Sequence, residues 1–354
     1  MRHYEVEMLS KVIQVEMKQA EKMRKYLSER NLIRKGFKIR KDNKFVYFPV
    51  NKTTQEVDSY RIIEKEFEKI KTKPRTYKEI ISIKDKLRHE LPTSYDIIGD
   101  IILIRLQGDL LDYKKKIGES LLQINKNIKT VCLTKPVKGE LRVRDLEVIA
   151  GEKSTKTLHK EYGLKFEVDI SKTYFSPRLS TERKRVAGLV RHGEIIADMF
   201  AGVAPFSIMI AKYANPKIIY AIDKNKDAID YAQENIKRNN LLDKIEVIHA
   251  DSRKIHSILN PKGVKINRII MNLPFSSHLF LKYALKIMAS PCIIHYYDIL
   301  QEEKIDERIN ELKKIAKENK ISLTNLDIRK IKTYAPREFY MGIDITAKKH
   351  ADVA

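Results

Sequence analysis

The segment Asp198–Ser207, with the sequence DMFAGVAPFS, constrains the fold more than any other stretch of this chain. It follows a short apolar run of β type, Glu194–Ala197, and leads into a helix-like segment, Phe206–Tyr213. A strand that ends in a carboxylate, followed by a turn of small residues and a helix, can hold a cofactor. The small residues let the backbone approach the ligand, and the helix N-terminus presents free N–H groups. The segment therefore predicts a cofactor site.

Two later segments repeat the pattern of an apolar strand that ends in a polar group. Ile218–Asp223 (IIYAID) ends in a carboxylate about 20 residues further on, the spacing at which a doubly wound fold binds a ribose. Ile269–Pro274 (IIMNLP) ends in Asn-Leu-Pro. Three apolar strands that each end in a polar group are a much more specific signal of a ligand site than one glycine-containing turn.

From Glu194 onward, strand-like and helix-like segments alternate. This alternation predicts a mostly parallel sheet with helices on both faces, whose ligands bind outside the carboxyl ends of the strands. The fold class is therefore α/β, with a doubly wound sheet in the C-terminal part. The helix candidates there are Asp227–Asn239, Ser277–Ala289 and Glu303–Asn319.

The first seventy residues predict a small α/β domain. Residues 1–13 read as an N-terminal extension, and Val15–Arg30 reads as an amphipathic helix because Ala20, Met23 and Leu27 recur at helical spacing. Phe45–Val50 and Tyr60–Glu66 read as strands, and Lys71–Pro74 as a short basic linker.

The middle of the chain predicts a second α/β unit. Tyr95–Leu106 is apolar and is interrupted by Gly99, which indicates two strands joined by a turn or bulge. Apolar residues from Leu110 to Ile124 keep helical spacing. Thr130–Leu133 and Leu164–Ile170 then read as strands, and a helix capped at Ser180 or Thr181 should follow.

Charge and composition narrow the class of partner. With 70 Lys+Arg against 47 Asp+Glu, the 354-residue chain carries a formal net charge of +23, which is typical of proteins that bind a polyanion. Solvated lysine faces are the alternative explanation. Cys132 and Cys292 have no metal-ligand spacing, so we expect buried reduced thiols and no metal. No long apolar run or signal peptide is present, so we expect a cytoplasmic protein, with a monomer favoured.

Five motifs together resemble one family. DMFAGVAPFSI, NLP, KTYFSPRLSTER, ELRVRDLEVIAGE and TYAPREF are similar to the archaeal and eukaryotic S-adenosylmethionine-dependent methyltransferases that modify tRNA position 37. The similarity runs from about Val15 to Ile345, and TSYDIIGDI resembles the archaeal branch. Some members of that branch also, or instead, methylate C7 of the wyosine precursor 4-demethylwyosine.

The resemblance implies a domain organisation and a set of partners. It implies a small N-terminal domain (1–73) that contacts the outer corner of tRNA and a middle RNA-facing domain (74–170). A class I Rossmann-like methyltransferase domain (171–354) follows. The expected cofactor is S-adenosylmethionine, and the expected partner is tRNA, bound through its anticodon stem-loop.

Donor-side candidates sit at the strand ends. Asp223 is the candidate for the ribose hydroxyls, and Asp251 with Ser252 for the adenine amino group. Each carboxylate alone could instead be a helix cap or a surface charge. The methionine end would be shaped by Asp198, Phe200 and Gly202, and Arg183, Lys224 and Asn272 would lie near the cofactor. Ala204 departs from the glycine that the family has there, so we expect a narrower turn that could alter the donor's pose.

The acceptor side needs a base, because N1 of guanine is protonated and poorly nucleophilic. By resemblance, Glu182 is that base, Arg142 stabilises the charge on O6, and Asn272 holds the base edge or the cofactor. Tyr174 and Pro177 would position the flipped-out base. Alternatives are a helix-dipole role for Glu182, phosphate contacts for Arg142 and Arg144, and a helix cap for Asn272.

Other features bear on substrate choice. Phe275 stands where many members have lysine, which suggests that an aromatic group here favours a tricyclic base over plain guanine. Arg337, in the YAPR motif, is expected on a tRNA-facing loop, whereas Tyr296 and Tyr297 are expected in the core. Two further functions compete. An exocyclic-amine N-methyltransferase would favour Asn-Pro-Pro-aromatic over Asn-Leu-Pro-Phe, and a catalytically silent RNA-binding protein would not need Glu182.

Overall fold

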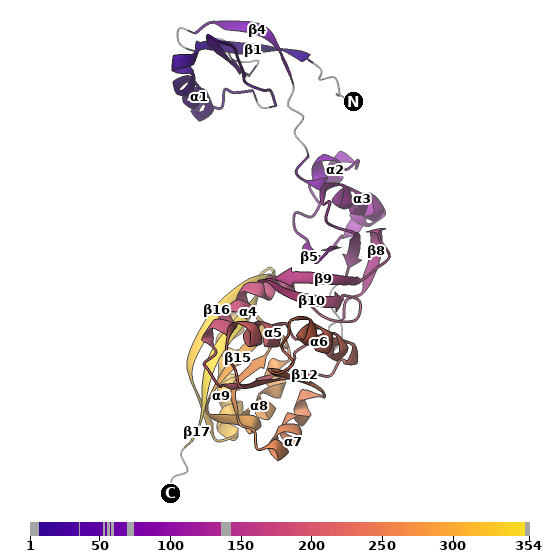
Figure 1. Cartoon of the computed structure of the whole chain (residues 1–354), viewed down its shortest axis with the longest axis vertical. Coiled ribbons are helices and arrows are strands. Elements are labelled where there is room, and N and C mark those ends of the chain that lie inside the picture. The colour runs from indigo at the N-terminus through magenta and orange to yellow at the C-terminus, as the bar shows by residue number, and fades with distance from the viewer. Residues whose placement is uncertain are drawn as a thin grey trace. The chain divides into compact units, whose positions relative to one another are not determined.

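We describe the fold from a computed structural model of the chain, which defines residues 7–34, 36–51, 54, 57, 60–68, 74–135 and 143–350. The chain separates into two compact units, Met1–Arg75 and Thr76–Ala354 (Figure 1). Each unit contains both helices and sheets, so the predicted α/β class is confirmed.

The smaller unit is an antiparallel sheet covered by a helix. Its strand order is β2-β3-β1-β4, and β1 pairs with both β3 and β4. Helix α1 (Ala20–Glu29) packs Met23 and Leu27 against Ile13 and Phe48 of the sheet. The strands are β1 (Glu7–Glu16), β2 (Arg40–Lys41), β3 (Phe45–Pro49) and β4 (Ile62–Glu68).

The structure corrects two predictions at the N-terminus. Residues 7–13 are not an extension, because β1 runs through the sheet and Val12 and Ile13 are 0% exposed. The helix begins at Ala20 and not at Val15, because Val15 is buried in the sheet opposite Val46. Valine and isoleucine are stiff at χ1 and pack well on a pleated surface, which favours the strand.

The larger unit opens with a sheet of order β5-β6-β7-β8. As predicted, Gly99 lies in the turn between β5 (Asp96–Ile98) and β6 (Ile101–Ile104), with φ of +56°. Helix α3 (Lys114–Ile124) connects β6 to the parallel strand β7. The other elements are the turns η2 (Tyr77–Glu79) and η3 (Gly108–Tyr113), the helix α2 (Asp85–Arg88), and the strands β7 (Thr130–Thr134), β8 (Leu146–Gly151), β9 (Lys156–Glu161) and β10 (Leu164–Asp169).

A seven-stranded sheet forms the rest of this unit, in the order β13-β12-β11-β14-β15-β17-β16. The first five strands in that order are parallel, and β17 is antiparallel to both of its neighbours. The strand order reverses between β11 and β14, and doubly wound folds bind ligands at such a switch point. The strands are β11 (Ile195–Asp198), β12 (Ile218–Asp223), β13 (Ile245–His249), β14 (Ile266–Met271), β15 (Met288–Gln301), β16 (Ile321–Ala335) and β17 (Glu338–Lys349).

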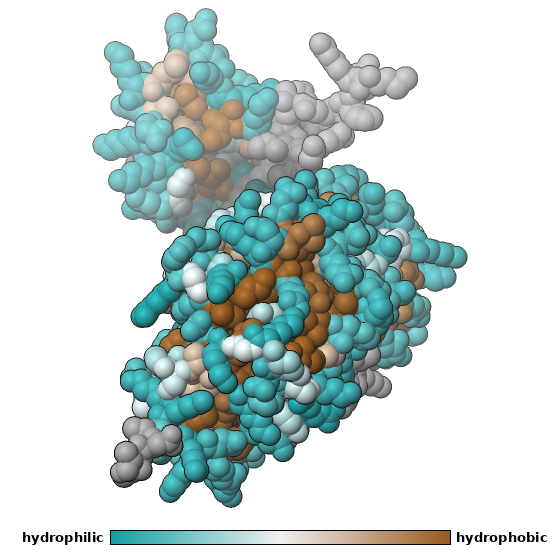
Figure 2. Space-filling view, turned by 60° about the horizontal axis from the view of Figure 1, so that its bottom comes forward, coloured by the Kyte–Doolittle hydropathy of each residue, from teal (hydrophilic) through white to brown (hydrophobic). Residues whose placement is uncertain are grey.

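Helices cover both faces of this sheet, as the alternation predicted. One apolar core contains residues of α4 (Ser180–Leu189), α5 (Pro205–Tyr213) and α6 (Lys226–Arg238). A second core contains residues of α7 (Ile255–Leu259), α8 (Leu281–Ile287) and α9 (Ile305–Glu318). The outer surface is largely hydrophilic, with a band of apolar side chains on the face shown in Figure 2.

Several details of this unit differ from the sequence-based expectations. Neither Ser180 nor Thr181 caps α4: the N-cap is Leu179, which has no side-chain capping bond, because the turn η4 (Pro177–Leu179) leads directly into the helix. Helix α7 was missed because five residues are too few to show a helical period. Cys132, Cys292, Tyr296 and Tyr297 are buried, as expected, and both cysteines are free thiols.

Asp198, at the end of β11, is buried in the sheet and is 1% exposed. Its Oδ2 accepts a hydrogen bond from the Ser207 hydroxyl at 2.8 Å. Burial raises the pKa of Asp198 to about 7, since desolvation disfavours the charged carboxylate. Its position under the turn makes it part of the core.

We expect Gly99→Ala to destabilise the larger unit more than Gly163→Ala does. Both glycines have positive φ, but a Cβ on Gly99 would lie 2.0 Å from Thr157 Oγ1 and 2.9 Å from Leu158 O, whereas nothing lies within 4 Å of a Cβ on Gly163. The backbone strain is shared, so the additional loss at Gly99 should be about 1–3 kcal/mol in urea unfolding. Equal losses would mean that the turn accommodates the methyl group.

We also expect Asp198→Asn to remove a pH dependence of stability. The pKa is near 7 in the folded protein and 3.8 in the reference state, so the folded form binds this proton more tightly. Stability therefore falls as the pH rises from about 4 to about 7. The stability of the variant relative to wild type should therefore be higher at pH 8 than at pH 5 by roughly 2–3 kcal/mol. Asp243→Asn, at an exposed turn, is the control for the substitution itself.

Candidate active site

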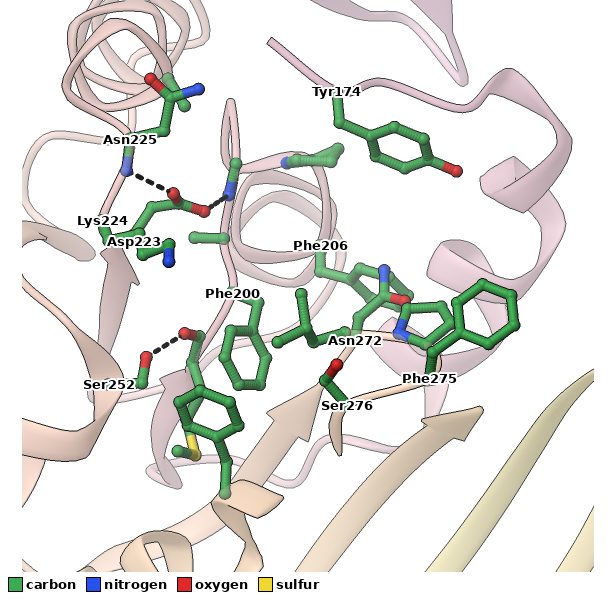
Figure 3. A pocket seen from close by; sticks show the side chains of 18 of the residues that line it. Tyr174, Phe200, Phe206, Asp223, Lys224, Asn225, Ser252, Asn272, Phe275 and Ser276 are labelled. Atoms are coloured by element: carbon green, nitrogen blue, oxygen red, sulfur yellow. Dashed lines mark hydrogen bonds between the residues drawn. The ribbon is translucent and has the colours of Figure 1, made fainter. Parts of the chain in front are cut away.

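A cavity of about 540 Å³ lies at the carboxyl ends of the parallel strands, next to the switch point. Its walls come from the segments that follow β11, β12, β13 and β14 and from the segment before α4 (Figure 3). Ten of the residues predicted for the site line it: Tyr174, Arg183, Phe200, Gly202, Asp223, Lys224, Asp251, Ser252, Asn272 and Phe275.

Asp223 connects the turn after β11 to the end of β12 by hydrogen bonds. Its Oδ2 accepts the backbone N–H of Gly202 at 2.7 Å, and its Oδ1 accepts that of Asn225 at 2.9 Å. Burial raises the pKa of this carboxyl above its usual value, although the backbone donors act in the opposite direction. Each oxygen of a carboxylate has two lone pairs, so both can accept a further hydrogen bond from a ligand hydroxyl.

The end of β13 is occupied by Asp251 and Ser252. Arg253 donates from its backbone and from its guanidinium to Asp251, and these bonds lower the pKa of that carboxyl to about 2. Asp251 is also the N-cap of the turn η5 (Ser252–Lys254), so the predicted alternative of a helix cap is observed. The Ser252 hydroxyl donates to the carbonyl of Met199 and so joins the ends of β13 and β11.

Asn272 follows β14 and faces the cavity. Its Oδ1 accepts a hydrogen bond from the hydroxyl of Tyr340 on β17. The turn η7 (Ser277–Phe280) has Ser276 as its N-cap, so Asn272 does not cap the next helix. The Tyr340 bond orients the side-chain amide, so its nitrogen can donate to a ligand and its oxygen can accept one further hydrogen bond.

The wall before α4 carries Tyr174 and Arg183. The Arg183 guanidinium is buried and donates to Glu161 Oε1 at 2.7 Å and to the carbonyl of Ser176 at 3.2 Å. Arg144 does not line the cavity, but its guanidinium lies 4.9 Å from the Tyr174 ring centre and donates to the carbonyl of Phe175. Arg144 therefore supports the Tyr174 segment from outside.

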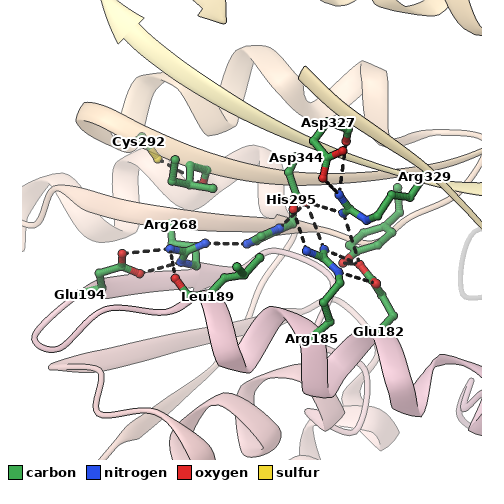
Figure 4. Close-up of polar contacts among 12 residues, drawn as sticks. Glu182, Arg185, Leu189, Glu194, Arg268, Cys292, His295, Asp327, Arg329 and Asp344 are labelled. Carbon is green, nitrogen blue, oxygen red and sulfur yellow. Dashed lines mark hydrogen bonds and ion pairs between the residues drawn. The ribbon is translucent and has the colours of Figure 1, made fainter. Parts of the chain in front are cut away.

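Glu182 lies behind this wall in a buried ionic cluster (Figure 4). Arg185 donates to both of its oxygens, at 2.8 and 2.7 Å, and the Tyr297 hydroxyl donates to Oε1 at 2.8 Å. Arg185 also donates to Asp344 Oδ2 at 2.9 Å. Glu182 is in the first turn of α4, as predicted, but it is not among the residues that line the cavity.

Of the remaining predicted residues, those that the structure describes lie outside the cavity lining. Pro177 begins the turn η4, and Arg337 is exposed in the tight turn between β16 and β17. Arg142 is outside the residues that the structure describes. Ala204 has φ of +64° and caps α5, but it is 0% exposed and packs in the apolar core. Its methyl group therefore does not line the cavity, and the expectation that it narrows the turn and alters the donor's pose stays a prediction.

Sequence reasoning missed part of the cavity wall. Asn225 caps α6 with its side chain, and its position two residues after the carboxylate of β12 could have indicated it. Phe280 packs edge-on against Phe200 with ring centres 4.9 Å apart, and Tyr283 is one turn further. Tyr334 comes from the long hairpin β16–β17, and no local signal places that hairpin at the cavity.

Within the described part of the chain, no cluster of three or more His, Cys, Asp or Glu side chains could hold a metal ion. None of the helices described is both long and apolar enough to cross a bilayer.

Comparison with known proteins gives three matches to family models. Residues 157–324 match the TRM5/TYW2 methyltransferase domain, residues 77–155 the TYW2 N-terminal domain, and residues 13–58 the tRNA methyltransferase 5 N-terminal domain. These matches fall in both compact units of the chain.

Individual relatives agree with these models. The chain is 37% identical to the tRNA (guanine(37)-N(1))-methyltransferase Trm5b of Pyrococcus abyssi, over 94% of this chain and 97% of the relative. It is 35% identical to the tRNA(Phe) (4-demethylwyosine(37)-C(7)) aminocarboxypropyltransferase of Methanocaldococcus jannaschii, over 71% of this chain and 96% of the relative. The crystal structure of Pyrococcus abyssi Trm5b superposes with a TM-score of 0.82 at 36% identity, over 96% of this chain and 99% of that one. The chain therefore belongs to the TRM5/TYW2 family of methyltransferases.

Proposed function

We propose that this protein is an S-adenosylmethionine-dependent methyltransferase that acts on N1 of guanosine 37 in tRNA, in the cytoplasm. The observation that carries the proposal is the extent of the match. A relative named as a guanine-N1 methyltransferase aligns with 94% of this chain, including the smaller unit, whereas two relatives named as aminocarboxypropyltransferases align with 71% and 78% of it. The smaller unit thus groups the chain with the methyltransferases.

The cavity fits the proposed cofactor. Its volume lies within the range of about 300–1,000 Å³ that is usual for cofactor sites. Asp223 offers two carboxylate oxygens to the ribose hydroxyls, and Phe200 offers an apolar wall to the adenine, near Asp251 and Ser252. Related structures support this fit, since that of Methanocaldococcus jannaschii TYW2 is described as a complex with AdoMet. When bound, the cofactor supplies a methyl group on a sulfonium, which is transferred by an in-line displacement.

The acceptor base is proposed to enter from the side of Asn272 and Tyr174. Asn272 would donate from its amide nitrogen to the base edge, since the bond from Tyr340 orients this amide. Glu182 would accept the N1 proton, and Arg142 would stabilise the charge that develops on O6. For this, the carboxylate of Glu182 must reach the base from its cluster with Arg185 and Tyr297. Tyr174 and Pro177 would position the extruded base.

Substrate RNA is proposed to contact both units of the chain. The net charge of +23 favours a polyanion. A related structure is described as the complex of aTrm5 and tRNALeu, which supports tRNA as the partner. We assign the anticodon stem-loop to residues 74–170 and 171–354, including Arg144 and Arg337, and the outer corner of the tRNA to residues 1–73. A monomer is favoured for the oligomeric state.

A second candidate substrate is 4-demethylwyosine at the same position. The observation in its favour is the match of residues 77–155 to a TYW2 domain, together with relatives that act on C7 of that base. The reaction in those relatives' names transfers an aminocarboxypropyl group, so both that product and C7 methylation have to be assayed. The alternative function, an exocyclic-amine N-methyltransferase, remains disfavoured, because such enzymes favour Asn-Pro-Pro-aromatic and this chain has Leu273 at the first proline position. A silent RNA-binding protein would show no transfer at all.

We expect methyl transfer to an unmodified tRNA transcript with guanosine at position 37, and Glu182→Gln should reduce its single-turnover rate about 10²- to 10⁴-fold. The amide keeps the shape of the side chain but cannot take a proton from N1. Cofactor affinity should be unchanged, because Glu182 does not line the cavity. Radiolabelled transfer with mass analysis of the product nucleoside measures this, and a tRNA carrying 4-demethylwyosine tests the second candidate. Unaltered transfer by the variant would exclude Glu182 as the base.

We expect Asp223→Asn to weaken binding of S-adenosylmethionine about 10- to 100-fold in calorimetry. The variant loses one carboxylate oxygen as an acceptor and leaves the Gly202 or the Asn225 N–H without its partner. Asp243→Asn, at an exposed turn, is the matched control and should bind like wild type. Equal affinity of the two variants would remove Asp223 from the site.

A further inference from the structure

Phe275 has a backbone conformation that bulky residues rarely adopt. Its φ is +74°, in the left-handed region, and its side chain is 49% exposed. A non-glycine residue in that region is strained, and neither burial nor a local turn preference of phenylalanine compensates the strain. A strained aromatic side chain that faces solvent at the edge of a cavity calls for a functional explanation.

The surrounding turn holds Phe275 in place. Its backbone N–H donates to Oδ1 of the buried Asp298 at 2.9 Å. On the same turn, the Ser277 hydroxyl accepts the N–H of Leu273 at 3.1 Å and donates to the carbonyl of Met271 at 3.0 Å. Because the anchors are backbone bonds, they fix the direction of the side chain without requiring any particular residue at position 275.

A second exposed aromatic residue packs against Phe275 from a different element. Tyr334, near the end of β16, is 41% exposed, and its ring meets that of Phe275 edge-on, with centres 5.6 Å apart and planes at 75°. Both residues line the cavity at its rim. In Figure 3, Phe275 lies on the far side of Asn272 from Asp223, away from the proposed ribose site. We call Phe275 and Tyr334 the rim pair.

We propose that the rim pair is a stacking platform for the unpaired nucleobase next to the target, at position 36 or 38 of the anticodon loop. This inference rests on the proposed function. When the target base is extruded into the cavity, its neighbour loses a stacking partner, and an exposed aromatic surface at the mouth can replace it. The exposed cations Lys282, which lines the cavity, and Arg337, three residues after Tyr334, suit the phosphates that flank such a base.

A functional and a structural role of Phe275 predict different effects of removing its ring on the stability of the protein. A ring needed for packing would destabilise the protein when removed. A ring held under strain for ligand binding would not, because Phe275→Gly relieves the left-handed conformation. Tyr162 is a matched control: it is 44% exposed, has φ of +46°, and lies in the β9–β10 turn, outside the cavity lining. Tyr162→Gly should leave tRNA methylation unchanged.

The experiment compares wild type, Phe275→Gly, Tyr334→Leu and Tyr162→Gly on four tRNAs: intact with guanosine at 37, abasic at 36, abasic at 38, and intact with 4-demethylwyosine at 37. On intact tRNA we expect kcat/KM to fall about 5- to 150-fold for each rim variant, the range for one lost base–aromatic stack. Cofactor affinity and Tm should not fall. For wild type, one of the two abasic transcripts should show a similar loss, and the rim variants should lose no more than about twofold further on that transcript.

The outcomes discriminate between explanations. If the losses from the rim variants and from each abasic site multiply, the platform does not contact a neighbouring base and the proposal is overturned. A loss that depends only on whether position 37 is guanosine or 4-demethylwyosine would also overturn it and favour contact with the target base. If wild type modifies none of the RNAs, the proposed function fails. Stacking can then be tested by the fluorescence quenching of 2-aminopurine at position 36 or 38, because this measurement requires only binding of the tRNA. Quenching that is lost in Phe275→Gly supports the platform. Equal quenching in the variant and in wild type rejects it.

Discussion

A largely buried cluster of charges links α4 to the sheet of the larger unit. Removing charged groups from water costs several kcal/mol for each ion unless partners with good geometry compensate. Here Asp344 of β17 accepts from Arg185 of α4 at 2.9 Å and contacts Nδ1 of His295 on β15 at 2.6 Å. Nε2 of His295 contacts Arg268 of β14 at 2.8 Å, and Arg268 pairs with Glu194 just before β11. The chain of contacts therefore crosses from the helix through three strands.

The protonation pattern of this cluster follows from its donors. A guanidinium can only donate, so His295 Nε2 accepts from Arg268 and Nδ1 carries the proton that it donates to Asp344. Burial lowers the pKa of His295, which is consistent with that neutral tautomer. Burial alone would raise the pKa of Asp344, but the bonds from His295 and Arg185 outweigh it and lower the pKa. Asp344 thus stays charged and holds Arg185, which in turn holds Glu182.

Much of the fold could be predicted because its signals are local. The strands β11, β12 and β14 are short apolar runs, and Asp198 and Asp223 end two of them, so the position of the cavity could be predicted from topology. The turn at Gly99 could also be predicted, because a glycine that interrupts an apolar run is a local signal. The start of the chain was not, because Val12 and Ile13 become strand residues only through pairing with segments about 35 to 50 positions away. Long-range pairing leaves no local periodicity to detect.

The residues of the candidate site also fall into two groups, those with a local sequence signal and those placed by long-range pairing. Asp223 and Asn272 could be predicted, since a strand end places them, and the structure brings both to the cavity. The partners that define their chemistry could not be predicted: Tyr340, which fixes Asn272, and Tyr297, which binds Glu182, come from β17 and β15. Tyr334 belongs to the motif TYAPREF, but its place at the rim depends on the length of the β16–β17 hairpin, which no local signal gives.

Two residues with left-handed backbone conformations in the larger unit differ in whether packing compensates their strain. Ala204 and Phe275 both have positive φ without being glycine, and both were noticed as departures from the family pattern. Ala204 is fully buried, and its methyl group fills the core above α5, so packing offsets the backbone cost. Phe275 gains little from packing because half of its side chain faces solvent. Its anchors, Asp298 and Ser277, are the groups that maintain the conformation, and they would do so for glycine as well. An aromatic side chain on a backbone conformation that glycine would adopt at a lower cost is consistent with the proposed contact between this ring and the substrate RNA.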